Sequence, residues 1–113
     1  MIVILQKPAV DEDITKAKEE YKSYIKVTID IEGEVVAIGG EYHFDAEQKL
    51  LAMGCRQDNI WGGGVDLVSK RVDTNAMINI RPKRNEATEI MDSNIKERFV
   101  NVVKKYLAGY VNN

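Results

Sequence analysis

Two stretches decide the fold, Lys26-Val27-Thr28-Ile29-Asp30-Ile31 and Glu34-Val35-Val36-Ala37-Ile38. The first alternates polar and apolar residues and is rich in β-branched side chains, which is typical of a strand buried on one face. The second is also apolar and β-branched, and Glu32-Gly33 lies between the two as a suitable turn. The sequence therefore predicts an antiparallel hairpin over residues 26–38.

The other elements are predicted from the periodicity of apolar residues on either side of this hairpin. Helices are expected at residues 11–24, at residues 45–53 and from Asp92 or Ser93 to Leu107. Strands are expected at residues 2–5, 65–72 and 76–81, with an optional short strand at 88–91. The three glycines of residues 62–64 predict a flexible loop. The order βαββαββ(β)α indicates an α+β fold, with an antiparallel or mixed sheet of about five strands and about three helices packed on one face.

Length and composition fit one small domain. The chain has 113 residues, 44% of them hydrophobic, and a formal net charge of −2. A chain of this size can bury a core without disulfides, so we expect a single soluble domain, 1–113. No apolar run approaches the ~18 residues of a membrane helix and no secretory leader is present, so we expect no membrane contact and a cytoplasmic location. The near-neutral charge argues against nucleic acid as a partner.

The sharpest local motif is Glu41-x-His43-x-Asp45. If the second hairpin strand continues to residue 44, these three side chains share one strand face, with successive ones about 6.5 Å apart. They could then hold a divalent metal, or form a base with an orienting carboxylate. The alternative is that Asp45 caps the following helix and His43 is an ordinary surface or hydrogen-bonded histidine. The lone Cys55 and lone His43 cannot supply a structural zinc site.

Two further motifs carry groups that could bind a ligand. Trp61 precedes three glycines, so a ligand could stack on its ring next to Gly62, or Trp61 could simply fill the core. Asn79 and Arg81 share one face of the strand predicted at 76–81, and Arg81 suits a bidentate grip on a phosphate or carboxylate. Its partner could also be internal, with Glu41 as a candidate carboxylate.

Three runs of the chain are distinctive together, namely residues 37–47, 57–62 and 77–82. From about residue 31 to residue 107 the sequence resembles a family of small prokaryotic proteins of unknown function, with Gly-Gly-Glu-x-His-x-Asp, Trp-Gly and Ile-Asn-Ile-Arg-Pro motifs. The matching positions are Gly40, Glu41, His43, Asp45, Trp61, Gly62, Asn79, Arg81 and Pro82. Cys55 stands where the family tends to have serine, and Asn85-Glu86-Ala87 replaces Asn-Arg-Ser, so that arginine is absent here. The resemblance implies no known reaction, cofactor or partner.

These motifs together predict one polar cleft that binds a small polar or anionic ligand, or a metal ion. The candidate catalytic residues are His43, Glu41 and Arg81, and the candidate ligand-binding residues are Trp61, Gly62, Asn79 and Asp45. The cofactor stays unknown, and the sequence leaves open whether the protein is an enzyme, because it supplies no clear nucleophile and no complete metal shell. The alternative is a non-catalytic protein-interaction module, or a homodimer paired through the strands at 2–5 or 65–72.

Overall fold

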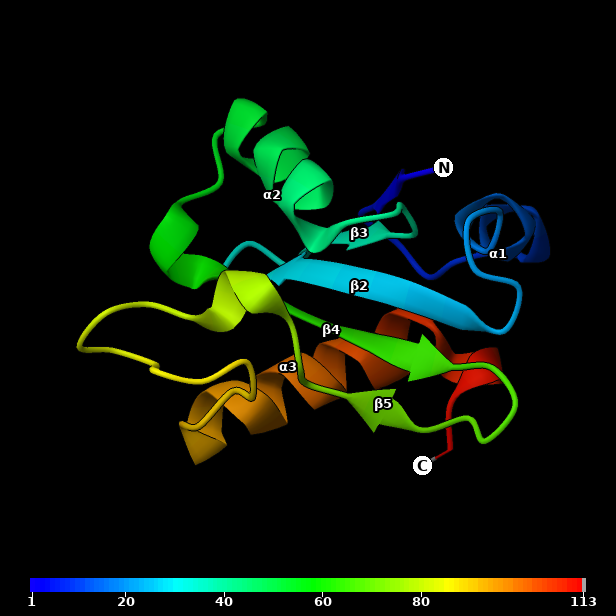
Figure 1. The fold of residues 1–113 in the computed structure, drawn as a ribbon. Coiled ribbons are helices and arrows are strands. Elements are labelled where there is room, and N and C mark those ends of the chain that lie inside the picture. Colours follow the sequence, from blue (N-terminus) through cyan, green and yellow to red (C-terminus); the bar gives the residue numbers. More distant parts are fainter. Residues whose placement is uncertain (113) are drawn as a thin grey trace.

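The computed structural model describes residues 1–112 and has an α+β fold, with three helices packed against one five-stranded antiparallel sheet (Figure 1). The strands are β1 (Val3–Leu5), β2 (Tyr24–Asp30), β3 (Val35–Ile38), β4 (Ile60–Asp66) and β5 (Val72–Asp73). The helices are α1 (Asp11–Ala17), α2 (His43–Ala52) and α3 (Ser93–Tyr106), with 3-10 turns η1 (Gln57–Asn59), η2 (Met77–Asn79) and η3 (Ala108–Tyr110). The predicted fold class is confirmed, and so is the order of strands and helices.

The predicted hairpin is formed by β2 and β3, and β2 lies at the centre of the sheet. The strand order is β1-β3-β2-β4-β5, and every neighbouring pair is antiparallel. The turn that follows β2 is held by Asp30, whose Oδ1 accepts hydrogen bonds of 3.0 Å from the backbone N–H groups of Glu32 and Gly33. The local alternation therefore predicted both the strands and their pairing correctly.

The helices cover both faces of the sheet. In Figure 1, α2 lies above the sheet and α3 below it. The larger core includes Ile29 of β2 together with Phe99 of α3, and the smaller one joins Ala37 of β3 to Leu50 of α2. The prediction that the helices pack on one face is wrong. The alternation in β2 predicted that its polar face is exposed. Thr28 on that face is nevertheless fully buried, because α2 covers it.

Residues 62–64, predicted as a loop, form the middle of β4. A side chain at Gly63 would collide with the backbone oxygen of Asp73 and would lie 2.8 Å from Phe99 Cε1. The strand needs glycine here because other parts of the chain pack closely on it. Its flanking residues Ile60, Trp61 and Val65 are buried, which is the strand signal that the glycines obscured.

The two strands predicted after these glycines are also misplaced. Residues 65–72 contain the end of β4 and the turn before β5, not one strand. Residues 76–81 contain η2, because the buried Asn79 turns toward β4 and takes the chain out of an extended conformation. The optional strand at 88–91 is represented by an isolated bridge between Asn75 and Glu89.

The helix boundaries differ at two places. The first helix ends at Ala17, well before residue 24, which already begins β2. The second begins at His43 rather than Asp45, because Gly39 and Gly40 adopt φ angles of 89° and 91° and turn the chain out of the sheet. The third was predicted correctly, and Asp92 caps it. Within residues 1–112, no helix is long and apolar enough to cross a membrane.

Candidate functional site

His43 lies in the first turn of α2 and places its imidazole on β4. Its Nε2 atom is 2.6 Å from the backbone oxygen of Gly63. Gly62 makes room for the ring, since a Cβ atom there would lie 3.0 Å from His43 Cδ2 and 2.7 Å from Ala76 Cβ. A carbonyl oxygen only accepts hydrogen bonds, so Nε2 carries a hydrogen and donates it. In the neutral ring, Nδ1 is then the free acceptor.

The surroundings of His43 favour this neutral form. Burial lowers the pKa of the imidazole below its ordinary value of 6.5, and the nearby Lys26 ammonium lowers it further. The Gly63 carbonyl and the Asp73 carboxylate act in the opposite direction without cancelling the effect of burial. At neutral pH, His43 is therefore an uncharged side chain with a free acceptor atom.

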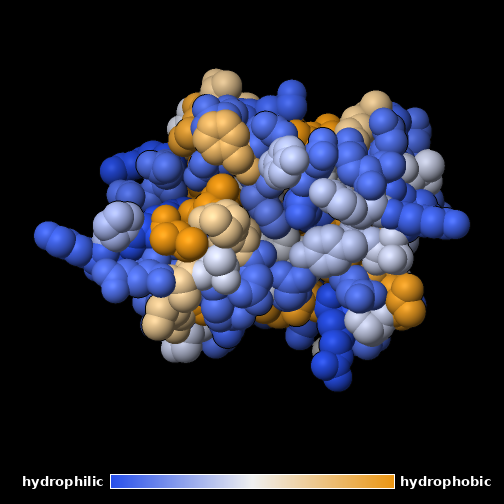
Figure 2. Space-filling model, in the orientation of Figure 1, coloured by the Kyte–Doolittle hydropathy of each residue, from blue (hydrophilic) through white to orange (hydrophobic). Residues whose placement is uncertain are grey.

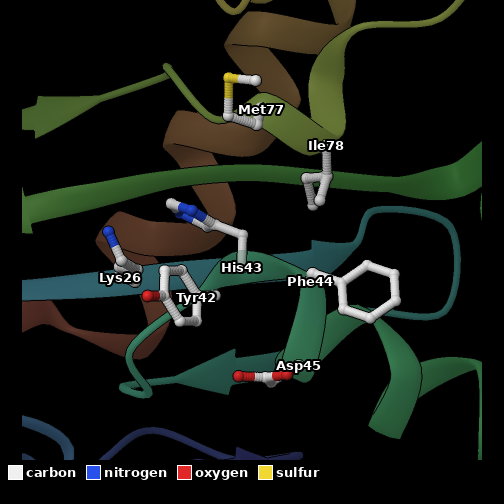
Figure 3. A pocket seen from close by; sticks show the side chains of 7 residues that line it. All are labelled: Lys26, Tyr42, His43, Phe44, Asp45, Met77 and Ile78. Carbon is white, nitrogen blue, oxygen red and sulfur yellow. The ribbon is translucent and has the colours of Figure 1, made fainter.

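Two adjoining cavities open beside this histidine, and both are lined by Lys26, His43 and Met77. The first has a volume of about 260 Å³ and is lined in addition by Tyr42, Phe44, Asp45 and Ile78 (Figure 3). The second has a volume of about 470 Å³ and is lined in addition by Tyr24, Asp73, Asn75, Ala76 and Thr88. We call them the apolar cavity and the polar cavity, and together they form the cleft.

Lys26 supplies a positive charge at the junction of the two cavities. Its Nζ atom lies 5.0 Å from the centre of the Tyr21 ring and 5.8 Å from that of the Tyr24 ring. The ion pairs between described residues do not include Lys26. Its ammonium group is therefore held by aromatic faces and stays available to an anion.

Tyr24 and Asp73 form a hydrogen-bonded pair in the polar cavity. The Tyr24 hydroxyl donates to Asp73 Oδ2 over 2.6 Å, and the backbone N–H of Asn75 donates to Asp73 Oδ1 over 3.1 Å. Burial and the adjacent carboxylate raise the pKa of Tyr24 far above its usual value, so the phenol keeps its proton. Asp73 takes part in none of the ion pairs between described residues.

The mouth of the apolar cavity is formed by large exposed side chains. Tyr42 is 60% exposed, Phe44 58% and Met77 73%. Figure 2 shows hydrophobic side chains gathered over α2 and η2, among an otherwise mostly hydrophilic surface. Exposed apolar clusters of this kind mark sites that bind ligands or other proteins.

Asn79 completes the sheet edge rather than the cleft. It is fully buried, accepts a hydrogen bond from Gly62 N and donates to Gly62 O, both at 2.9 Å. It also donates to the backbone oxygens of Thr74 and Thr88. The amide thus takes the place of a neighbouring strand where β5 does not reach.

Arg81 also donates to backbone oxygens, at the start of β4. Its guanidinium donates to the backbone oxygens of Asp58 and Ile60 and lies 4.0 Å above the Trp61 ring. Trp61 is only 1% exposed, so the interpretation of this residue as a core side chain is confirmed. Arg81 does not pair with Glu41, as one prediction had it, because its two terminal nitrogens bond to backbone oxygens at the start of β4, while Nε is buried without a partner among the described residues.

The structure does not bring Glu41 and Arg81 to His43. Neither lines the cavities next to the imidazole, and Glu41 is exposed. Asp45 lines the apolar cavity, but Figure 3 shows its carboxylate apart from the imidazole. Since α2 begins at His43, the three residues of the motif do not alternate along a strand. No group of three or more potential metal ligands occurs among residues 1–112.

Sequence reasoning missed most of the cleft. Tyr24 was expected in a helix, Lys26 is a polar position of the predicted hairpin, and Asp73 lies between the strands predicted at 65–72 and 76–81. Tyr42 and Phe44, on either side of His43, are a local signal of an apolar site, but the possible extension of the second hairpin strand to residue 44 obscured it. Lys26 and Asp73 become neighbours of His43 only through the pairing of β2 with β4 and of β4 with β5.

Comparison with known families assigns the chain to one family. A family model described as a protein of unknown function (DUF5674) matches residues 3–106, so the chain belongs to this family. Comparisons with curated proteins and with solved structures gave no match.

Proposed function

We propose that this member of the DUF5674 family binds a small anionic molecule with an apolar part, in the cleft beside His43. The observation that carries the proposal is the Lys26 ammonium, which has no carboxylate partner among the described residues and lines both cavities. A carboxylate or phosphate of the ligand would pair with it. Small-molecule sites are typically concave and apolar, with a few polar groups that fix orientation.

The apolar cavity supports the proposal that the ligand has an apolar part. Its volume of about 260 Å³ is close to the lower end of the range for ligand sites. Tyr42, Phe44 and Met77 would lose exposed area when an aromatic or aliphatic group covers them, which gains about 25 cal/mol per Å² of apolar surface. The flexible Met77 side chain can adapt to groups of different shape.

His43 would orient the ligand. Its bond to Gly63 fixes the ring, so the free Nδ1 faces a defined direction and can accept a hydrogen bond from a hydroxyl or N–H group of the ligand. The predicted catalytic roles of His43, Glu41 and Arg81 are not part of this proposal, since only His43 lines the cleft.

The test is a titration with monocarboxylates of increasing tail size, from butanoate to octanoate and 3-phenylpropanoate, followed by calorimetry and by NMR of the methionine methyl groups. We expect millimolar or tighter binding of the larger ligands and a shift of the Met77 signal. Lys26→Gln should weaken binding at least about ten-fold, as expected for a lost charge-assisted bond. Lys49→Gln, an exposed lysine of α2 outside the cleft, is the matched control.

Two results would refute this function. One is the absence of binding by any of these carboxylates at millimolar concentration. The other is equal binding by the wild type and by Lys26→Gln, which would show that the anion pairs elsewhere.

A homodimer is the second candidate, and the exposed apolar mouth of the cleft favours it over pairing through strand edges. β1 is an edge strand of only three residues, and most of residues 65–72 are not a strand at all. In a dimer formed through the mouth, Phe44→Asp would lower the association seen in sedimentation velocity. Met53→Asp, a change of a similarly exposed residue outside the cleft, would leave it unchanged. A strictly monomeric wild type would exclude this candidate.

A further inference from the structure

The cleft holds a second unpaired charge of opposite sign to Lys26. Asp73 lines the polar cavity, and the groups that bind its carboxylate are a phenol and a backbone N–H, both neutral. A half-buried carboxylate without a cation is a strong acceptor for a ligand that brings its own positive charge. Among the described residues, the polar cavity therefore presents the Lys26 ammonium and the Asp73 carboxylate without ion-pair partners, and Asp45 is a further carboxylate at the apolar cavity.

Both charges line the polar cavity, whose volume of about 470 Å³ can hold a small zwitterion. Lys26 Nζ lies 5.8 Å from the centre of the Tyr24 ring, and the hydroxyl of that ring is 2.6 Å from Asp73 Oδ2. The ammonium and the carboxylate thus adjoin the same phenol ring, and they form no ion pair with each other within 4.0 Å. A molecule between them needs only one hydrogen bond of about 2.8 Å at each end.

The apolar cavity adjoins this pair of charges. Lys26, His43 and Met77 line both cavities, so a ligand held by its charges at the junction can extend a side chain toward Tyr42 and Phe44. Figure 3 shows His43 between Lys26 and the apolar residues Met77 and Ile78. The neutral His43 adds no charge that would repel the ammonium group of the ligand.

We propose that the cleft binds an α-amino acid with a large apolar side chain, with its carboxylate on Lys26, its ammonium on Asp73 and its side chain in the apolar cavity. This inference rests on the proposed function and narrows its ligand to one chemical class. It requires both charges of the ligand, whereas the proposed function requires only the anion and the apolar group.

Calorimetric titration with four compounds separates the two claims. L-phenylalanine carries all three features, 3-phenylpropanoate lacks the ammonium, 2-phenylethylamine lacks the carboxylate, and L-alanine lacks the large side chain. We expect L-phenylalanine to bind at least about ten-fold more tightly than each of the others. If it binds no more tightly than 3-phenylpropanoate, the amino-acid inference is overturned while the proposed function stands. If none of the four binds, the amino-acid inference fails, and the proposed function fails with it when octanoate does not bind either.

Substitutions of the cleft carboxylates test whether the ammonium group of the ligand binds Asp73. Asp73→Asn keeps an oxygen that can accept from Tyr24, and it should lower the affinity for L-phenylalanine to that for 3-phenylpropanoate, whose own affinity should not change. Glu41→Gln, a change of an exposed carboxylate that lines neither cavity, is the matched control and should retain the preference, and Asp45→Asn tests the other carboxylate of the cleft. The opposite result, loss in Asp45→Asn and retention in Asp73→Asn, would refute the assignment. If Asp73→Asn does not fold, Asp73→Ser, which also removes the carboxylate, takes its place with the same expected loss of preference.

Discussion

Two regions beside β4 contain conspicuous polar side chains. They differ in whether those side chains find hydrogen-bond or ion-pair partners within the protein. Near the start of β4, Asn79 and Arg81 donate to backbone oxygens of β4 and of the residues just before it, and Asn79 is fully buried. Toward its other end, Lys26 and Asp73 line a cavity and have no ion-pair partner among the described residues. We call the first region the closed edge and the second the cleft.

The difference shows how a polar residue can be assigned to the fold or to a ligand. A buried amide whose donors meet backbone oxygens, as in Asn79, has no capacity left for a ligand, and a guanidinium whose terminal nitrogens bond to the backbone is held in place by the fold. An ammonium or carboxylate beside a cavity without a countercharge has that capacity. The closed edge should therefore control stability, and the cleft should control binding.

The largest effect is expected for Asn79→Ala at the closed edge. It removes hydrogen bonds to both backbone groups of Gly62 and to the oxygens of Thr74 and Thr88. Because each buried group left unpaired costs about 1–3 kcal/mol, the free energy of unfolding should fall by at least about 3 kcal/mol. Urea unfolding measures this loss, and Asn101→Ala on the exposed face of α3 is the control. A loss below about 1 kcal/mol would remove the distinction between the two regions.

Arg81→Ala should have the next largest effect, a loss of about 2 kcal/mol, because Ile60 O loses its donor and Trp61 loses the stacked guanidinium. Affinity for 3-phenylpropanoate should stay within about two-fold of wild type when measured well below the unfolding transition. Arg56→Ala, an exposed arginine without an ion pair among the described residues, should change neither quantity. A large loss of affinity in Arg81→Ala would instead return this residue to the binding site.

A smaller effect is expected from the pH dependence of stability. Burial holds the pKa of His43 in the folded protein below 6.5, so the unfolded chain takes up a proton more readily. The contribution of His43 to the free energy of unfolding is fully present above about pH 6.5, and it declines as the pH falls toward the folded-state pKa. Urea titrations between pH 7.5 and 5 should show a steeper decline for the wild type than for His43→Gln. Since His43 is the only histidine, equal slopes would contradict the neutral, buried imidazole.

The smallest effect is expected for Glu41→Gln. Its side chain is exposed and lines neither cavity, so stability should change by less than about 0.5 kcal/mol and ligand affinity should not change. Thermal unfolding and the 3-phenylpropanoate titration together test this. A loss of binding in Glu41→Gln would show that the cleft extends to the residue that the sequence motif first indicated.

Much of the fold was predictable because its signals are local. The alternation at residues 26–31 predicted β2, and the helical spacing that follows Asp92 predicted α3 together with its cap. The β4 prediction failed because glycine carries no apolar signal, although the close approach of Phe99 requires glycine at residue 63. Of the candidate site residues, His43 and Asp45 line a cavity, Gly62 makes room for the imidazole, and Asn79, Arg81 and Trp61 belong to the closed edge.

The sequence by itself determined the hairpin, the last helix and the α+β class, because each depends on residues a few positions apart. Only the tertiary structure decided that Asn79 completes β4 and that Lys26 and Asp73 both adjoin Tyr24. The physical reason is that a hydrophobic pattern records which side chains must leave water, whereas hydrogen bonding and charge pairing depend on partners supplied by distant segments. Which polar groups remain free for a ligand is therefore known only after the chain has folded.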